Sequence, residues 1–365
     1  MKVVFYIGHH KVGSTALQVF LAQNAAKLLQ AGILYPCVEM EGFAQLLARV
    51  SQTGDDTRPL PINIREPHSA LAYRMIAEVS DRPIPPQFRM LPRVDQMLHA
   101  IRQQIRYLQP QVVILCSEAF ANFGDVDAGL IPRLRRALPE ADLQIYCALR
   151  RPDDYLASWH GQRIKVGEAI PPLREVGPQA YADTIHADYT RLILPWVKAL
   201  PDAQIHLRPY AAIRAAGGSP EDFFACTGIP LPHGLLPAGR QNASLPRAAM
   251  EIQRRANMAL SPDQAHQLAR HMQSVGDQIR PLPDDQIDLF GPGQRAALAQ
   301  TFEPVHAVLG QVAGQDAFFT DADQIATPRP VPEMEAARHY LAQMRPGDLP
   351  GGALSSFIAD LQAGF

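Results

Sequence analysis

The chain has 365 residues, enough to bury a full hydrophobic core and to form one large domain or two smaller ones. Its 34 Lys and Arg residues nearly balance its 36 Asp and Glu residues, and the net charge of −2 excludes bulk electrostatic attraction to nucleic acid or to an anionic membrane. There is no apolar run of about 18 residues and no signal-peptide pattern, so we expect no integral membrane segment and a cytoplasmic location.

The four cysteines are widely spaced and include no C-x-x-C pair. Cys116 and Cys147 lie in apolar, strand-like runs, which is typical of buried, reduced thiols. We therefore expect neither a disulfide nor a metal site built on cysteine.

Short apolar runs alternate with helical patterns through the first two thirds of the chain. Strands are expected over 3–7, 33–35, 112–116, 143–149 and 204–208. Helices are expected over 13–30, 42–50, 67–79, 95–108, 127–138, from 152, over 181–200, 245–257, from 261, over 291–312 and 333–344. Strands alternating with helices predict an α/β fold, a P-loop-type parallel sheet flanked by helices.

Domain organisation follows from where the strands stop. We expect one α/β domain over 1–257, with a helical and irregular insertion over 36–108 that we assign to the side on which a substrate binds. Residues 258–365 have no strand signals, and we expect a helical extension packed on the same domain.

A glycine-containing loop separates the first strand from the first helix. Gly8 and Gly13 hold the two glycine positions of a P-loop, but Ser14 stands where its lysine belongs, and the lysine is Lys11 inside the loop. A nucleoside triphosphatase needs that lysine on its β- and γ-phosphates, next to a Mg²⁺ ligand. The loop amides and the helix N-terminus therefore predict a site for a phosphate-like group handled without a metal.

A second candidate anion site follows the strand over 143–149. Arg150 is at the strand exit and Ser158 is two turns into the next helix, so a guanidinium and a hydroxyl can reach one phosphate above the helix start. Both motifs, together with Glu118 and Tyr210, follow the carboxyl ends of strands, where parallel sheets bind ligands.

These two motifs together resemble those of the sulfotransferase family, whose donor is 3′-phosphoadenosine 5′-phosphosulfate. The family carries K-x-G-[ST]-[ST] after its first strand and R-[NRD]-P-x-[DE]-x-x-x-S later in the chain. This sequence has KVGST at residues 11–15 and RRPDDYLAS at residues 150–158, and the resemblance extends over about 1–257. It is similar above all to bacterial carbohydrate-type sulfotransferases.

The resemblance implies a set of residues that bind the donor. The loop residues would hold the 5′-phosphosulfate, Arg150 and Ser158 the 3′-phosphate, and Tyr210 either packs on adenine or is a buried tyrosine at a strand end. A late loop is implied to close over the nucleotide, with one residue on the 3′-phosphate and two that shape the loop. The implied loop residues are His10, Lys11, Val12, Gly13, Ser14 and Thr15, and those of the late loop are Arg240, Asn242 and Ser244.

The implied reaction moves a sulfuryl group to a hydroxyl or amine of a glycan or small-molecule acceptor. Lys11 would stabilise the leaving phosphate oxygen, and no metal is needed. Glu118 is the candidate general base, because it follows the third strand where cytosolic family members have a catalytic histidine. Its alternative role is to accept a hydrogen bond from Lys11 or from an N–H group at a helix start. His10 is a further catalytic candidate, with His9, His68 and Glu41 behind it.

Two other functions remain open from the sequence. A P-loop nucleotide kinase would share the loop, although Ser14 replaces the expected lysine. A non-catalytic nucleotide-binding module would keep the donor site and lack a base. The sequence identifies neither the acceptor nor the oligomeric state.

Overall fold

The computed structural model describes residues 1–51, 60–239, 244–275, 279 and 282–364. These residues form two compact units, each built from three segments of the chain. The first unit comprises Met1–Arg150, Asp183–Gln241 and Val305–Phe319, and the second comprises Arg151–Ala182, Asn242–Pro304 and Thr320–Phe365. The expected boundary between residues 257 and 258 falls inside helix α14 (Arg247–Ala259).

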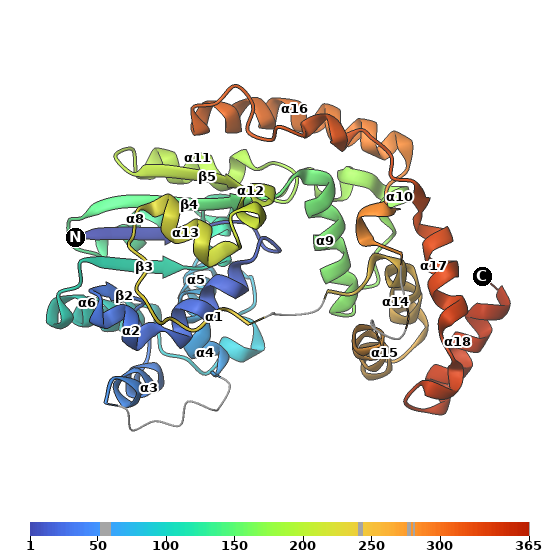
Figure 1. Ribbon diagram of the computed structural model, residues 1–365, viewed down its shortest axis with the longest axis horizontal. Coiled ribbons are helices and arrows are strands. Elements are labelled where there is room, and N and C mark those ends of the chain that lie inside the picture. The colour runs from blue at the N-terminus through green and yellow to red at the C-terminus, as the bar shows by residue number, and fades with distance from the viewer. Residues whose placement is uncertain (52–59, 240–243, 276–278, 280–281, 365) are drawn as a thin grey trace. The chain divides into compact units, whose positions relative to one another are not determined.

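A five-stranded parallel sheet organises the first unit (Figure 1). The strand order is β2-β3-β1-β4-β5, and the central strand β1 pairs with β3 and β4 from Lys2 to Tyr6. The strands are β1 (Lys2–Tyr6), β2 (Ile33–Leu34), β3 (Val112–Cys116), β4 (Asp142–Leu149) and β5 (Gln204–Pro209). The parallel sheet expected from the continuous apolar runs is confirmed, as is its flanking by helices.

Helices cover both faces of this sheet (Figure 1). On one face Tyr6 packs with Phe20 and Phe223 in a single apolar cluster. On the other face the ring of Phe5 lies 5.5 Å from that of Trp196. The helices of this unit are α1 (Ser14–Gln23), α2 (Ala25–Gln30), α3 (Met40–Val50), α4 (Ile62–Arg65), α5 (Pro67–Ala77), α6 (Val94–Leu108), α7 (Phe123–Val126), α8 (Leu130–Arg136), α11 (Thr190–Ala199), α12 (Tyr210–Ala215) and α13 (Ser219–Thr227).

Two expected helices are shorter than the apolar periodicity indicates. The pattern over 13–30 is divided into α1 and α2 at Asn24, whose side-chain amide donates to the carbonyls of Phe20 and Leu236, both at 2.9 Å. The pattern over 181–200 forms a regular helix only from Thr190, whose N–H donates to the Asp188 carboxylate at 3.0 Å just before the helix.

The second unit is mainly helical. Helix α14 packs against α9 and α15 and against α17. The prediction of a tail without strands is wrong, because β6 (Ile287–Asp288) pairs in parallel with β7 (Val331–Pro332). Two-residue strands leave no alternation for sequence patterns to detect. The other helices of this unit are α9 (Pro152–Lys165), α10 (Leu173–Val176), α15 (Pro262–Ser274), α17 (Glu333–Gln343) and α18 (Gly352–Gly364), while α16 (Pro292–Ala313) supplies residues to both units.

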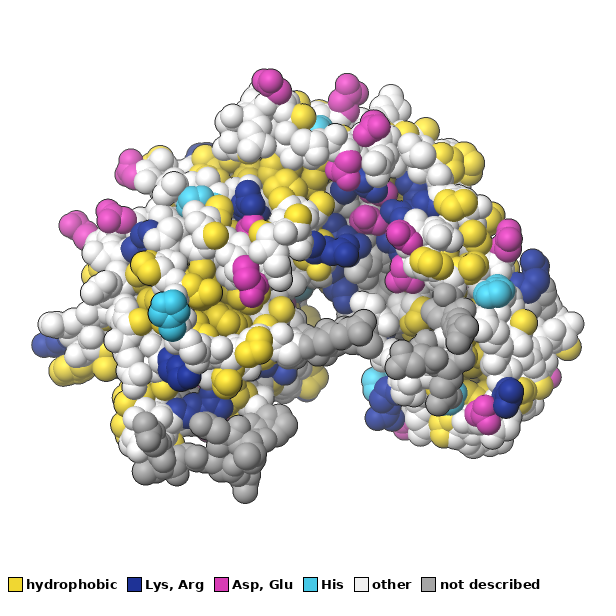
Figure 2. Space-filling model, viewed as in Figure 1, with side chains coloured by type: hydrophobic (Ala, Val, Ile, Leu, Met, Phe, Trp, Pro, Cys, Tyr) yellow, Lys and Arg dark blue, Asp and Glu magenta, His cyan; other side chains and the backbone are white. Residues whose placement is uncertain are grey.

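Charged groups of both signs are interspersed on the face shown in Figure 2, in keeping with the net charge of −2. In the described ranges every helix is too short or too polar to traverse a lipid bilayer. The thiols of Cys116 and Cys147 are buried in β3 and β4, as the apolar runs around them indicate.

Candidate functional site

The loop after β1 stays tightly against the sheet. The His9 N–H donates to the Ala148 carbonyl at 3.0 Å, which extends the β1–β4 pairing beyond the strand. A Cβ atom on Gly8 would lie 2.8 Å from the backbone N and O of Ala148, so only glycine fits this position. The loop is thereby fixed at the carboxyl end of the central strand.

The rest of the loop turns sharply into α1. Lys11 and Gly13 both have left-handed backbones, with φ of 62° and 85°. A Cβ atom on Gly13 would lie 2.2 Å from the Ser219 Oγ, so this glycine is required by packing as well as by conformation. Left-handed residues next to a helix N-terminus direct successive N–H groups into one concavity, which is an arrangement that binds anions.

Glu118 lies beside this loop. It opens the 3₁₀ helix after β3 (Glu118–Asn122), and its Oε1 is 3.6 Å from the His10 Nδ1. Gln18, one turn after Ser14 on α1, donates to Glu118 Oε2 at 3.3 Å. Glu118, predicted as the base, therefore lies beside His10 and Ser14 of the predicted donor loop.

The surroundings of Glu118 keep it ionised. Its burial raises the pKa, but a hydrogen bond with His10, the nearby His10 ring and the Ser14 hydroxyl outweigh burial and leave the pKa below its usual value. A lowered pKa makes the carboxylate a ready hydrogen-bond acceptor at neutral pH and a weaker base. The side chains beside Glu118 are thus His10, Ser14 and Gln18, and its predicted alternative role, accepting from Lys11 or from an N–H group at a helix start, stays a prediction.

A second carboxyl group, Glu66, belongs to the same electrostatic cluster. Burial raises its pKa, and the negative charge of Glu118 raises it further, while Arg65 and His10 act in the opposite direction. The Arg65 guanidinium donates to the Glu66 Oε1 at 2.9 Å. Sequence reasoning missed Glu66, because it lies within the insertion and only the folded chain brings it near Glu118.

Tyr210 lies beside the loop, and Arg150 lies against Tyr210. The Arg150 guanidinium carbon lies 5.5 Å from the centre of the Tyr210 ring, a cation–π geometry. The same ring lies 3.6 Å from where a Cβ on Gly13 would be. The Tyr189 hydroxyl also donates to the Arg150 carbonyl at 2.8 Å and fixes the backbone where the strand ends.

Of the remaining predicted donor residues, Lys11 and Val12 belong to the loop, Thr15 to α1, and Ser158 and Ser244 to the second unit. Lys11 and Thr15 are half-buried and Val12 is buried within the loop. Ser158 is half-buried in α9 of the second unit, and Ser244 is exposed in that unit. Arg240 and Asn242 lie outside the described residues.

The three lower-ranked candidates for the general base, His68, His9 and Glu41, each contact other groups of the protein. His68 is fully buried, its Nδ1 accepts the Cys116 N–H at 3.2 Å, and burial lowers its pKa to about 3. His9 is buried against the Tyr189 ring, with its Nε2 3.0 Å from the Ile185 carbonyl. Glu41 accepts from Asn63 at 3.1 Å in the insertion.

Arg151 and the acidic residues after it act within the second unit. The Arg151 Nε donates to Asp153 at 2.7 Å, and its Nη1 to Asp321 at 2.5 Å. Asp153, 1% exposed, also accepts from Arg295 and Arg329 at 3.4 Å each. Arg151 and Asp153 of the RRPDDYLAS motif thus stabilise the start of α9.

Comparison of the chain with protein-family models, curated proteins and solved structures finds no match. Among the described residues, no three His, Cys, Asp or Glu side chains are grouped so as to hold a metal ion.

Proposed function

We propose that this protein is a sulfotransferase that uses 3′-phosphoadenosine 5′-phosphosulfate as donor and a hydroxyl or amine of a glycan or small molecule as acceptor. The observation that carries the proposal is that the Tyr210 ring lies beside Gly13 of the loop and that the Arg150 guanidinium lies against the same ring. The two motifs that would hold the two ends of the donor, far apart in sequence, supply groups to one edge of the sheet.

We also assign the sheet to the P-loop type. The loop follows the central strand of the order β2-β3-β1-β4-β5 and leads directly into α1, which supports that assignment. A Cβ atom on Gly8 or Gly13 would collide with Ala148 or Ser219, so these two glycines let the loop pack closely against β4 and α13 at the carboxyl end of β1.

In the proposed reaction the acceptor oxygen or nitrogen attacks the sulfur of the donor. The S–O bond to the phosphate breaks, and adenosine 3′,5′-bisphosphate leaves. The Lys11 ammonium and the loop N–H groups stabilise the negative charge on the leaving oxygen, a contribution of roughly 3–4 kcal/mol for each well-placed donor. The acceptor proton passes to Glu118, which is ionised and so can take a proton although its lowered pKa makes it a weak base, with the His10 imidazole at 3.6 Å as its partner.

Nucleotide binding without Mg²⁺ tests this proposal. Adenosine 3′,5′-bisphosphate should raise the melting temperature of the full chain in the presence of a metal chelator, and Lys11→Ala should remove both that shift and sulfuryl transfer. Lys198→Ala, which removes the same charge from the exposed end of α11, is the matched control and should behave as the wild type.

Two outcomes would support the other functions. Stabilisation by ATP with Mg²⁺ but not by the bisphosphate would overturn the proposal in favour of a nucleotide kinase. Binding of the bisphosphate without transfer to any member of a broad glycan and metabolite panel would indicate a non-catalytic binding module.

A further inference from the structure

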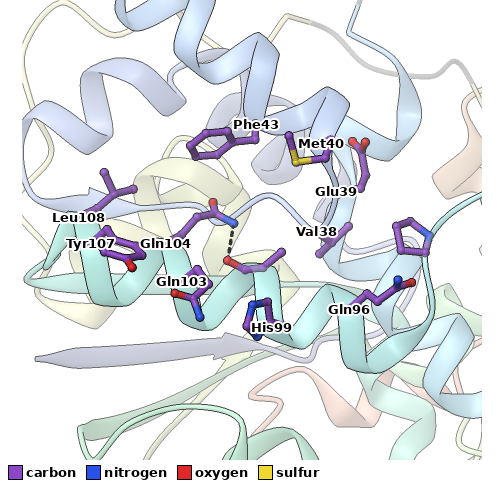
Figure 3. A pocket seen from close by; sticks show the side chains of 12 residues that line it. Val38, Glu39, Met40, Phe43, Gln96, His99, Gln103, Gln104, Tyr107 and Leu108 are labelled. Atoms are coloured by element: carbon purple, nitrogen blue, oxygen red, sulfur yellow. Dashed lines mark hydrogen bonds between the residues drawn. The ribbon is translucent and has the colours of Figure 1, made fainter.

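A groove of about 490 Å³ lies between α3 and α6, inside the insertion (Figure 3). Volumes of this size are typical of sites for small molecules. The residues that line it are Val38, Glu39, Met40, Phe43, Pro92, Gln96, His99, Ala100, Gln103, Gln104, Tyr107 and Leu108.

The groove is built on a fixed floor. Gln104 is buried, its Nε2 donates to the Cys37 carbonyl at 2.7 Å, and its Oε1 accepts the Cys37 N–H at 3.0 Å. This pair of hydrogen bonds fastens α6 to the segment that follows β2. The cavity therefore does not depend on exposed side chains alone.

The wall formed by α3 is apolar and open to solvent. Met40 is 77% exposed and Phe43 is 39% exposed, and Leu47 continues the same helical stripe one turn further on. Leaving large apolar side chains in water forfeits roughly 1.5–3 kcal/mol for each that a ligand would bury fully. An apolar occupant recovers part of that free energy.

The two ends of the groove differ in polarity. At one end Tyr107 and Leu108 provide an apolar border, and at the other lies the Glu39 carboxylate (Figure 3). Glu39 accepts the N–H groups of Glu41 and Gly42 at 2.6 and 2.7 Å, and Asn63 at 3.2 Å. The described lining contains no Lys or Arg to pair with an anionic headgroup, and both Glu39 oxygens already accept hydrogen bonds from the protein, so the polar end suits hydroxyl groups better than a charged headgroup.

We propose that this groove binds the alkyl or acyl chain of an uncharged amphiphile, with a hydroxylated headgroup at the Glu39 end and the chain toward Leu108. The apolar α3 wall packs against the chain, and the hydroxyl groups hydrogen-bond near Glu39 and Gln96. Binding of this ligand is separate from binding of the sulfuryl donor and does not depend on the proposed reaction.

Calorimetric titration of the full chain with n-decyl β-D-maltoside, below its critical micelle concentration, tests the inference. We expect saturable one-to-one binding with a negative heat-capacity change, the signature of apolar burial. Maltose, which lacks the chain, should give no binding. Decanoate, with an anionic headgroup, should bind at least tenfold more weakly than the maltoside.

Variants locate the site. Ala100→Trp fills the groove from α6 and Phe43→Gln removes its apolar wall, so each should weaken maltoside binding at least tenfold with an unchanged circular dichroism spectrum. Met90→Ser is the matched control, because Met90 is 96% exposed and lies outside the lining. If one groove variant fails to fold, the other still decides the outcome.

Three results would overturn the inference: no binding of the maltoside, binding unchanged in both groove variants, or decanoate binding as tightly as the maltoside. A concentration-dependent dimer abolished by Phe43→Gln, without maltoside binding, would instead assign this face to contact between two copies of the chain. None of these results bears on nucleotide binding at the loop, so the proposed function stands or falls separately.

Discussion

Both the left-handed backbone at Gly13 and the packing around it require glycine at this position. Gly13→Ala should lower the free energy of unfolding by more than the roughly 1–3 kcal/mol of a left-handed alanine, because the new methyl group also meets the Ser219 Oγ. Urea denaturation measures the loss. Gly167→Ala is the control for backbone strain alone, since Gly167 has φ of 100° and an open surrounding.

The double variant Gly13→Ala/Ser219→Gly separates the two effects. Removing the Ser219 hydroxymethyl group relieves the collision and leaves the left-handed conformation, so part of the lost stability should return. A double variant as unstable as the sum of its two single variants would contradict the packing explanation.

Glu118 makes stability depend on pH. Its pKa is lower in the folded protein than its ordinary value of 4.5, so its contribution is fully present above that value and is lost as the pH falls through the folded-state pKa. The free energy of unfolding should therefore fall more steeply on acidification in the wild type than in Glu118→Gln. Denaturation curves at a series of acidic pH values test this, and parallel curves would refute it. Glu140→Gln, which changes an exposed carboxylate, should leave the wild-type slope intact.

Among the elements, the junction of α1 and α2 holds the segment over 230–239. The Asn24 side chain exchanges hydrogen bonds with the Leu236 backbone, accepting its N–H at 2.8 Å and donating to its carbonyl at 2.9 Å. Asn24→Ala removes both of these part-buried hydrogen bonds, each with a net contribution of about 0.5–1.5 kcal/mol, and should lower the free energy of unfolding by that order. Limited proteolysis should then cut this segment sooner. Gln23→Ala, whose bonds to the same segment are exposed, should have a smaller effect.

The central sheet could be predicted because its determinants are local. Continuous apolar runs and the glycines after β1 mark the strands and the loop, and both are visible within a few residues of sequence. The break at Asn24 could not be predicted from local sequence, because one partner of the Asn24 side chain is Leu236, more than two hundred residues away.

Some residues of the candidate site could likewise be predicted from the sequence, and others could not. The loop and Arg150 could be recognised from short motifs, whereas Glu66 and Gln18 become relevant only where the fold brings them to Glu118. Gln18 has a weak local signal, since it stands four residues after Ser14 and so on the same helix face. Glu66 has none.

In the molecule as a whole, the second unit depends on buried charges. Asp153 faces the guanidinium groups of Arg151, Arg295 and Arg329, and Asp153→Asn would leave these cations under-compensated. We expect the free energy of unfolding to fall by about 3–5 kcal/mol. Hydrogen exchange should show faster exchange in α9 and unchanged protection in β1. As a control, Asp95→Asn removes the charge of a carboxylate that is 90% exposed and pairs with Arg133. It should lower the free energy of unfolding by less than about 1 kcal/mol.

The chain passes between the two units at residues 150/151, 182/183, 241/242, 304/305 and 319/320. All five strands of the sheet are synthesised once the ribosome has passed Pro209. The last segment of the first unit, Val305–Phe319, is synthesised only after much of the second unit. A fragment that ends near residue 257 therefore keeps the whole sheet and deprives both units of part of their own sequence. Separate expression of either unit requires engineered linkers that join its three segments, because no single truncation isolates one.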